Sequence, residues 1–403
     1  MKVIYDPMTM RVPIKSWCDG VEASAFEQAK TLSKHPAIFK HVALMPDCHA
    51  GMGMPIGGVV ALYNAISPNM VGVDIGCGMC AVQTHYKLAD IGGSTLRNIR
   101  NDIAQIVPVG FSHRDPNWLA DTHPGILMEM NRFDNFIVDD LEKRMNGVVS
   151  IEKVKEQIGT LGGGNHFIEI QRDTDGYIWV MIHSGSRNIG KQIADFYNKK
   201  AIDLCRKWHS DLPNKDLAFF PYDSDLGQEY YDSMNFALKF AYENRRVMMM
   251  ILAKIFLDRG IEWDSDWQQK MINIHHNYAT MENHFGSNVV VHRKGATLAR
   301  AGTIGIIPGS MGTSSYIVRG LGNKESFNSC SHGAGRKMSR SKAKKTIDME
   351  DFTKVMQGVD YTPIKDNLDE APQAYKDIDQ VMEQQQDLVS IEVKLTPLAV
   401  VKG

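Results

Sequence analysis

The sequence lacks the features that would place the chain in a membrane or outside the cell. No run of eighteen apolar residues occurs, so we expect no membrane-spanning helix. The opening MKVIYDPMTM has no apolar stretch followed by a small-residue cleavage site, so we expect no secretory signal. Six cysteines in 403 residues are too few for a disulfide scaffold. These absences predict a protein of the reducing cytoplasm whose thiols are available as ligands.

An excess of charge of one sign is also missing. The chain has 45 basic and 47 acidic residues, which gives a formal net charge of -2. A nearly neutral molecule has no overall positive field to draw it to nucleic acids or membranes. Any polyanionic partner must therefore meet a local basic patch. Hydrophobic residues make up 43% of the chain, which excludes intrinsic disorder and predicts a large core.

No linker, low-complexity segment or internal repeat divides the chain. Helical spacing of apolar residues alternates with short β-rich runs, which predicts one intertwined α/β (α+β) domain over residues 1–403. The expected helices are residues 21–34, 94–106, 124–144, 186–208 and 228–258. The expected strands are Val42–Met45, Gly58–Leu62, Phe167–Ile170, Ile178–Ile182, Val289–Val291, Ile304–Ile307 and Tyr316–Val318.

Glycine is concentrated in two windows. Residues 46–80 hold seven glycines and residues 301–340 hold eight, where the chain average would put about three in each. Tight turns, or a backbone that closely approaches a ligand, require such glycines. Ordinary turns and β-bulges would explain the glycines of either window if it stood alone. The histidines beside both windows favour a ligand.

Potential metal ligands lie in and beyond the first window. Asp74 and Cys77 are three residues apart in VGVDIGCG, and His166, His183 and the pair His275 and His276 each end a strand-like run or occupy a polar turn. A single histidine of this kind is more often a satisfied core or surface residue. Three such histidine sites together with Asp74 and Cys77 favour a borderline divalent cation, and Mn, Zn, Fe and Co all remain open. A zinc ribbon is excluded because only one Cys-x-x-Cys pair is present.

A histidine and several basic residues stand together in the second window. His332 lies in SCSHGAGR, whose glycines would let a phosphate approach the ring, and an imidazole nitrogen can attack phosphorus. Six of the ten residues 336–345 are basic and none is acidic, which is typical of a phosphate-binding patch or of a solvated helix face. The turn IPGSMGTSS offers hydroxyl donors, but it is no P-loop because the Gly-Lys-Ser/Thr ending is absent.

Taken in order along the chain, these motifs resemble those of the RtcB family of RNA-splicing and RNA-repair ligases. The matching blocks run from residue 45 to residue 403 and read MPDCH, VGVDIGCG, GGGNHFIE, HSGSR, HHNY, RKGA, GIIPGSMGTSSYIVRGLGN, SCSHGAGR, AYKDID and VVKG. The resemblance covers nearly the whole chain. It implies a single domain with β-sheets surrounded by helices and a central cleft for metal and nucleotide.

The resemblance also implies a reaction. The enzyme would use GTP and two Mn(II) ions to join an RNA 2′,3′-cyclic phosphate or 3′-phosphate end to a 5′-hydroxyl end. His332 would be the nucleophile that becomes guanylylated, and Asp47 would position or deprotonate the incoming hydroxyl. The metal ligands, with a bridging thiolate among them, would be Asp74, Cys77, His166, His183 and His276.

Binding residues follow from the same resemblance. Glu169 would accept hydrogen bonds from the N1–H and N2–H edge of guanine, which adenine lacks. The nucleotide-binding set would be Asn165, Glu169, Ser310, Ser315, Gly333, Ala334, Gly335, Tyr375 and Lys402. The side chains that hold RNA phosphates would be Arg187, Arg336, Arg340 and Lys344.

Parts of the chain depart from the family pattern. Met52 and Met54 stand where some relatives carry a lysine or an aromatic residue near the mouth of the active site, a difference that bears on RNA-end preference. Residues 110–125 are less familiar, and their His113 and His123 receive no role. The chain lacks the extra length of archaeal and animal forms, which predicts a compact bacterial type.

Two other functions would use the same residues. A metal-dependent phosphoesterase or cyclic phosphodiesterase would need the same cage but would form no bond between histidine and nucleotide. A nucleotide-regulated RNA-binding protein would use the basic patch without turnover, although a complete ligand set argues against it. His332 is the residue that discriminates among the three. No motif points to a protein partner, to an oligomeric state, or to transfer RNA rather than damaged RNA.

Overall fold

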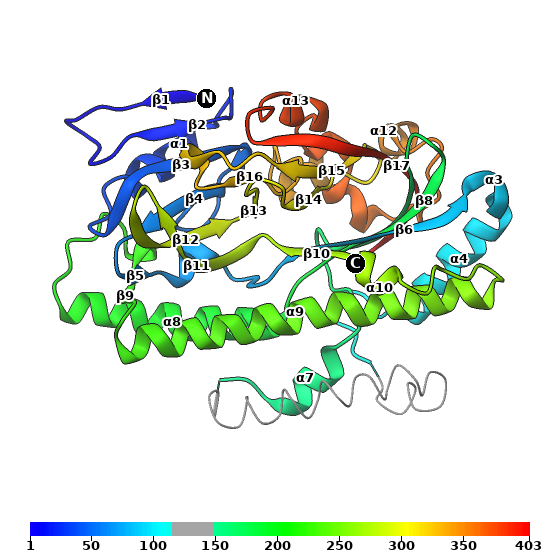
Figure 1. Ribbon diagram of the computed structural model, residues 1–403, viewed down its shortest axis with the longest axis horizontal. Coiled ribbons are helices and arrows are strands. Elements are labelled where there is room, and N and C mark those ends of the chain that lie inside the picture. Colours follow the sequence, from blue (N-terminus) through cyan, green and yellow to red (C-terminus); the bar gives the residue numbers. More distant parts are fainter. Residues whose placement is uncertain (115–147) are drawn as a thin grey trace.

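Two mostly antiparallel sheets organise the part of the chain that the structure, a computed structural model, describes, residues 1–114 and 148–403 (Figure 1). The first sheet has six strands in the order β1 (Lys2–Ile4), β2 (Ile14–Ser16), β3 (Ile38–His49), β4 (Ile56–Leu62), β12 (Ser287–Lys294) and β11 (Asn277–His284). The second has seven in the order β10 (Ile272–His275), β6 (Gly78–Lys87), β8 (Tyr177–Ser184), β7 (Phe167–Arg172), β17 (Val389–Lys402), β15 (Ser315–Gly320) and β14 (Ile304–Ile307). Two short pairs join β13 (Ala296–Leu298) to β16 (Ser329–Ser331) and β5 (Ala65–Ile66) to β9 (Phe220–Pro221).

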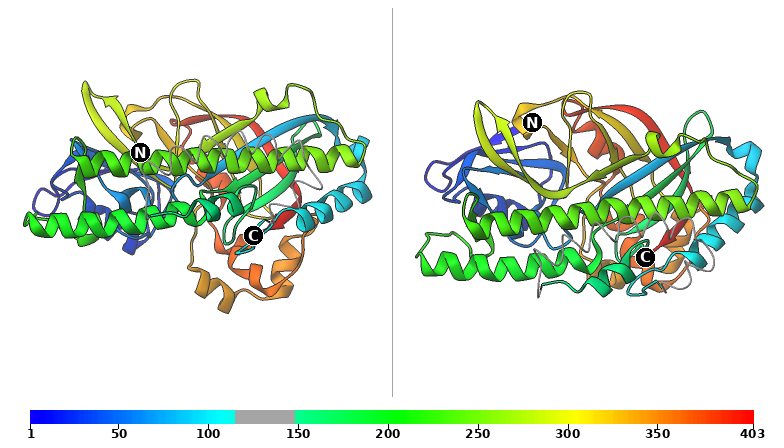
Figure 2. Two further views of the ribbon diagram at one scale, coloured as in Figure 1. Left: turned by 90° about the horizontal axis from the view of Figure 1, so that it is seen from below. Right: turned by 60° about the horizontal axis from the view of Figure 1, so that its bottom comes forward.

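Helices surround these sheets. The two longest, α8 (Arg187–Lys207) and α9 (Asp225–Asp258), pack side by side and run along one face of the molecule in every view (Figures 1 and 2). The others in the described residues are α1 (Ala23–Leu32), α2 (Pro68–Val71), α3 (Leu88–Ile91), α4 (Gly93–Ile106), α7 (Ile151–Gln157), α10 (Trp267–Lys270), α11 (Arg340–Thr346), α12 (Met349–Val355) and α13 (Ile378–Glu383). Short 3-10 turns are η1 (Lys215–Leu217), η2 (Lys324–Ser326), η3 (Lys365–Glu370) and η4 (Pro372–Ala374).

Helix α9 shows how the local sequence produces a long element. Ser224 caps its first turn, because the serine side chain accepts a hydrogen bond from the Gly227 N–H. Buried residues then recur every three or four positions, as in Tyr230, Met234 and Ala237, so one stripe of the helix faces the protein interior. The main core fills the space between this stripe, helices α4 and α8, and the seven-stranded sheet.

The structure confirms the α/β fold class and most of the expected elements. Each expected strand lies within an observed one, and the expected helices at 21–34, 94–106, 186–208 and 228–258 correspond to α1, α4, α8 and α9. The helix expected at 124–144 lies outside the described residues. No helix in the described part of the chain has the length and apolarity needed to cross a membrane.

Strands interrupted by proline were the hardest to foresee. The expected strand at Val42–Met45 stops before Pro46, whereas β3 continues through an irregular register to His49. The long C-terminal strand β17 was not expected at all. It contains Pro397, and its register with β7 shifts between Pro397 and Ala399. Proline cannot donate to a β-ladder, so a run that contains it does not read as a central strand.

Candidate functional site

Strand order in the seven-stranded sheet gathers four potential metal ligands at one edge. Strands β10, β6, β8 and β7 are neighbours and antiparallel, so the end of β10 and of β8 lie beside the beginning of β6 and of β7. His276 follows β10, Cys77 precedes β6, His183 is near the end of β8, and His166 precedes β7. Strand pairing therefore brings together ligands that are far apart in the sequence, such as Cys77 and His276, which are 199 positions apart.

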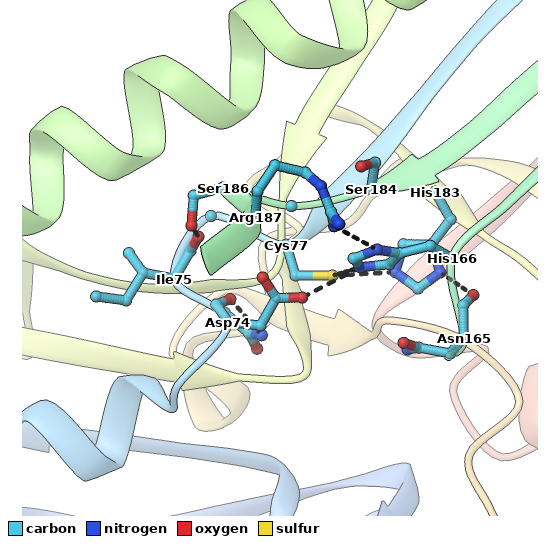
Figure 3. A network of polar contacts seen from close by, with 12 residues as sticks. Asp74, Ile75, Cys77, Asn165, His166, His183, Ser184, Ser186 and Arg187 are labelled. Carbon is cyan, nitrogen blue, oxygen red and sulfur yellow. Dashed lines mark hydrogen bonds and ion pairs between the residues drawn. The ribbon is translucent and has the colours of Figure 1, made fainter. Parts of the chain in front are cut away.

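The ligand atoms form two groups that share one thiol. Figure 3 shows Asp74, Cys77, His166 and His183 of this cluster. Cys77 Sγ lies 3.2 Å from His183 Nε2 and 3.5 Å from His166 Nε2. His183 Nε2 lies 3.4 Å from His276 Nε2, and Asp74 Oδ2 lies 3.2 Å from His166 Nε2. The two triads are Cys77, His183 and His276, and Asp74, Cys77 and His166; in each, all ligand atoms lie within 4.8 Å of one another.

The protonation states of this cluster suit a divalent cation. Burial lowers the pKa of His183 and of His276 well below their usual range, so both rings are neutral ligands at pH 7. His183 donates its Nδ1–H to the Asn165 carbonyl at 3.1 Å, which leaves the Nε2 lone pair facing the thiol. Burial and the Asp74 carboxylate raise the pKa of the Cys77 thiol well above its usual range, so a thiolate here needs a cation beside it.

A buried arginine on α9 supports the loops that carry these ligands. Arg245 has no exposed surface, and its Nη1 donates to the carbonyls of Gly76 at 3.0 Å and Ser184 at 2.8 Å. Gly76 precedes Cys77 and Ser184 follows His183. The helix thus fixes the backbone next to two ligands at once. The neighbouring loop is equally tight, because a Cβ on Gly185 would lie 2.3 Å from Asp74 Oδ1.

His332 stands beside the metal cluster and is paired with Asp47. His332 follows β16, its ring centroid lies 4.9 Å from that of His276, and its Nδ1 lies 2.6 Å from Asp47 Oδ2. The same carboxylate oxygen accepts the backbone N–H groups of His332 at 3.0 Å and Gly333 at 3.3 Å. Burial alone would raise the pKa of Asp47, but the interactions with His332, together with those of His49 and Lys376, outweigh burial and lower that pKa. Asp47 is therefore an ionised partner that holds Nδ1 and leaves Nε2 free.

A glycine lets these two segments approach each other. Gly335 adopts a left-handed φ of +74°, and a Cβ at this position would lie 2.1 Å from the Asp47 carbonyl oxygen. Any other residue would push the His332 loop away from β3.

A cavity of about 340 Å³ opens over the metal cluster and His332. Fourteen of the residues predicted from the sequence line it: Asp74, Cys77, Asn165, His183, His276, Ser310, His332, Gly333, Ala334, Gly335, Arg336, Arg340, Tyr375 and Lys402. Lys402 reaches this place because β17 pairs with β7, with Lys402 opposite Phe167. His166 lies behind the cavity wall but completes the second triad.

An acidic group neutralises several of the cavity's cations. Glu370 Oε1 lies 2.7 Å from Arg340 Nη1 and 3.2 Å from Arg336 Nη1, and its Oε2 lies 3.4 Å from Lys402 Nζ. Burial alone would raise the pKa of Glu370, but Lys402 and Arg340 outweigh it and keep this carboxylate ionised. The cations are thus held in place by an internal counter-ion that anionic phosphates can replace.

Some predicted site residues do not line the cavity. Asp47 is completely buried beside His332, and its expected role towards an incoming hydroxyl stays a prediction. Glu169 and Ser315 also lie behind the wall, where Gln171 Nε2 donates to both, at 2.6 and 3.1 Å. Burial raises the pKa of Glu169 to about 8, so it is mostly a neutral acid at pH 7.

The predicted phosphate-binding cations divide into three environments. Arg336 and Arg340 line the cavity, whereas Lys344 lies outside it on α11, 3.8 Å from carboxylates of Asp366 and Asp369. Arg187 points towards His166 (Figure 3), with Nη1 3.3 Å from His166 Nδ1, and does not line the cavity.

The sequence argument missed Lys294, Asn277 and Glu370, which also line the cavity. Lys294 is buried, donates to the Asn69 carbonyl at 3.0 Å, and has a pKa that burial lowers to about 8. Lys294 and Asn277 belong to the blocks RKGA and HHNY, which were a usable signal. Glu370 lies in no recognised block, and nothing local marks it.

The departures from the family pattern that fall on described residues do not line the cavity. Met54 is completely buried in the core beneath the six-stranded sheet, and Met52 is half exposed. Neither lines the cavity. His113 is exposed, while His123 lies outside the described residues.

Comparison with known proteins agrees with this site. The family described as "tRNA-splicing ligase RtcB" matches residues 28–403. The "RNA-splicing ligase RtcB" of Escherichia coli K12 is 40% identical over 98% of both chains. The "tRNA-splicing ligase RtcB" of Nanoarchaeum equitans is 33% identical over 98% of this chain and 96% of its own, and that of Methanococcus maripaludis is 31% identical over 98% and 95%. The motif order, the shared-thiol cluster and these matches lead to one conclusion: the chain belongs to the RtcB family of RNA-splicing ligases, enzymes that form phosphodiester bonds.

Proposed function

We propose that this ligase joins RNA ends that carry a 2′,3′-cyclic phosphate or 3′-phosphate to ends that carry a 5′-hydroxyl, using GTP and Mn(II). The observation that carries the proposal is the His332 and Asp47 pair. Asp47 holds Nδ1 of the ring at 2.6 Å, and His332 lines the cavity, so Nε2 is the nitrogen available to attack. A phosphoesterase with the same metal cage would form no bond between this histidine and a nucleotide.

The donor set fits two manganese ions. Asp74, Cys77, His166, His183 and His276 would hold them, with the thiolate shared between the triads. Bound there, the ions would neutralise charge on transferring phosphoryl oxygens. The convergence of unprotonated ring nitrogens on a buried thiol supports this fit, because the single thiol proton can satisfy only one of those nitrogens, whereas a cation can satisfy all of them.

The protein's own residues support the first chemical step. Nε2 of His332 forms a bond to the α-phosphorus of GTP, the bond from that phosphorus to the β-phosphate bridging oxygen breaks, and pyrophosphate leaves. The imidazole gains positive charge, which Asp47 balances at Nδ1. Arg336, Arg340 and Lys402 would exchange Glu370 for the phosphates of the nucleotide.

Two transfers would complete the reaction. An oxygen of the RNA 3′-phosphate attacks the phosphorus of the histidine-bound GMP, and the phosphorus–nitrogen bond breaks. The RNA 5′-hydroxyl oxygen then attacks the activated 3′-phosphate, loses its proton, and expels GMP. A cyclic end would first be hydrolysed to a 3′-phosphate. The names of the relatives, which include transfer-RNA splicing, favour RNA as the substrate, and we place the enzyme in the cytoplasm.

Self-guanylylation tests this proposal most directly. The protein is incubated with α-labelled GTP and Mn(II) and separated by denaturing electrophoresis. We expect a label that is acid-labile and alkali-stable, as a phosphoramidate is, and that is absent from His332→Ala. His85→Ala serves as a matched control, because His85 is half exposed and pairs with Asp264 away from the cavity. A wild-type protein that hydrolyses cyclic phosphates without taking up label would be a phosphodiesterase, and label that persists in His332→Ala would remove the assigned nucleophile.

A further inference from the structure

Lys376 connects the two segments that carry His332 and Asp47. It lies between η4 and α13, in the block AYKDID. Its ammonium donates to the Pro46 carbonyl at 3.0 Å and to the Cys48 carbonyl at 2.7 Å, which are the residues on either side of Asp47. Its backbone N–H donates to the Gly335 carbonyl at 2.9 Å, three residues beyond His332.

The surrounding pairing makes this connection rigid. Lys337 donates its N–H to the Ala374 carbonyl at 3.0 Å, and Arg336 and Tyr375 form an antiparallel bridge. The segment before α13 is therefore paired with the His332 loop along three consecutive residues. From that base the Lys376 side chain extends to β3 and holds the backbone around Asp47.

A cation is well suited to this position. One ammonium carries three donors, and here two are used on carbonyls while the third faces Cys18 Sγ at 3.4 Å. Among the residues that the structure describes, no carboxylate forms an ion pair with Lys376. Its ammonium charge thus interacts with peptide dipoles. A neutral side chain of similar length cannot make this interaction.

We propose that Lys376 is a positioning residue that holds Asp47 in register with His332 for attack on the nucleotide. The inference rests on the proposed function, since it concerns the same histidine. Lys376 does not line the cavity and contacts none of the metal ligands. Its loss should therefore slow the attack while leaving the binding of GTP and Mn(II) intact.

The test separates rate from binding. We expect Lys376→Met to lower the rate constant of self-guanylylation at saturating GTP by roughly tenfold to a hundredfold, as a displacement of about 1 Å does elsewhere. The GTP and Mn(II) concentrations that give half the maximal rate should change by less than about twofold. Lys376→Arg, which keeps the charge and the donors, should recover part of the rate. Lys394→Met is the matched control, because it removes the same charge from a half-exposed pair with Asp379.

A second readout does not depend on GTP. Diethyl pyrocarbonate acylates unprotonated imidazole, so the carbethoxylation rate of the His332 peptide, followed by mass spectrometry, reports how the ring is held. We expect His332 to be carbethoxylated more slowly in Lys376→Met than in the wild type and in Lys394→Met. Thermal unfolding curves would be used to choose temperatures at which every variant is folded. Wild-type rates of both guanylylation and acylation in Lys376→Met and Lys376→Arg would overturn the positioning role. If the wild type takes up no label from GTP while acylation of His332 is still slower in Lys376→Met, the proposed guanylylation is rejected. The positioning role of Lys376 is then retained.

Discussion

At the scale of single residues, the thiol of Cys77 has the largest consequence. It belongs to both ligand triads, whereas His276 belongs to one. We predict that Cys77→Ser weakens Mn(II) binding by roughly a hundredfold or more, beyond the tenfold to hundredfold typical of losing an outer partner of a ligand. A neutral hydroxyl cannot bridge two cations as a thiolate does. Calorimetry with Mn(II) would measure affinity and stoichiometry together.

Two comparisons make the result specific to a bridge. His276→Ala should lose one ion and keep the other. Cys205→Ser, at a buried cysteine of α8 outside the site, should bind manganese as the wild type does. Equal metal stoichiometry and ligation rate in Cys77→Ser and wild type would remove Cys77 from the site.

At the scale of elements, the β11 and β12 hairpin is locked by a buried ion pair next to the catalytic loop. Arg293 Nη1 lies 2.6 Å from Glu282 Oε1, and Arg293 Nη2 donates to the Phe327 carbonyl at 2.9 Å, in the segment that leads to β16. Burial alone would raise the pKa of Glu282, but the interactions with Arg293 and His284 together outweigh burial and lower the pKa to about 2. The ordinary value is 4.5.

The sign of the pH dependence follows from that lowered pKa. The stabilisation by ionised Glu282 is complete above about pH 4.5 and is lost as the pH falls through about 2. We predict that Glu282→Gln lowers the free energy of unfolding by about 3–5 kcal/mol at pH 7, because Arg293 is left buried without its partner. Urea unfolding at several pH values would measure this effect. The difference in free energy of unfolding between wild type and Glu282→Gln should become smaller below about pH 4.5.

An exposed pair supplies the contrast. Glu392 pairs with Arg319 at 3.0 Å between β15 and β17, where both side chains are more than a third exposed. Glu392→Gln should lower the free energy of unfolding far less than Glu282→Gln does, because solvent screens the exposed pair. If Glu282→Gln loses as little free energy of unfolding as Glu392→Gln, or loses an amount that does not depend on pH, the predicted stabilisation by the buried pair is wrong.

At the scale of the whole molecule, a chain with a net charge of -2 must bind RNA through a local patch. Lys344 is half exposed on α11, outside the cavity, and its nearest carboxylates are 3.8 Å away. We predict that Lys344→Gln raises the RNA concentration needed for ligation. The slope of log affinity against log salt should become shallower by about 0.7, as expected for one contact to a single-stranded phosphate. Guanylylation should be unchanged, because under the proposed function GTP would bind in the cavity and not on this part of α11.

Arg340 provides the comparison within the same helix. It lines the cavity and pairs with Glu370, so Arg340→Gln should lower both guanylylation and ligation. Lys354→Gln, on α12 and paired with Glu350, should change neither. Ligation measured over a salt series distinguishes the two interpretations of the basic residues 336–345. If the slope of log affinity against log salt is the same in Lys344→Gln as in wild type, this segment is a solvated helix face and not an RNA-binding patch.

The sequence by itself determined the family and most regular elements, and it supplied the candidate metal ligands and the candidate nucleophile. Asp74, Cys77, His166, His183, His276 and His332 stand in motifs whose order along the chain is enough to recognise them. Helices α8 and α9 and strands such as β8 follow from apolar periodicity, because that signal depends only on neighbours within a few residues.

Only the tertiary structure decided which of these residues line the cavity and which lie outside it. Asp47 and Glu169 lie behind the cavity wall, Glu370 lies within it, and Lys376 reaches across to β3. These outcomes depend on which strands pair, as with β17 beside β7, and on contacts between residues hundreds of positions apart. Local periodicity carries no information about such pairings, because strand order is set by the packing of the whole core.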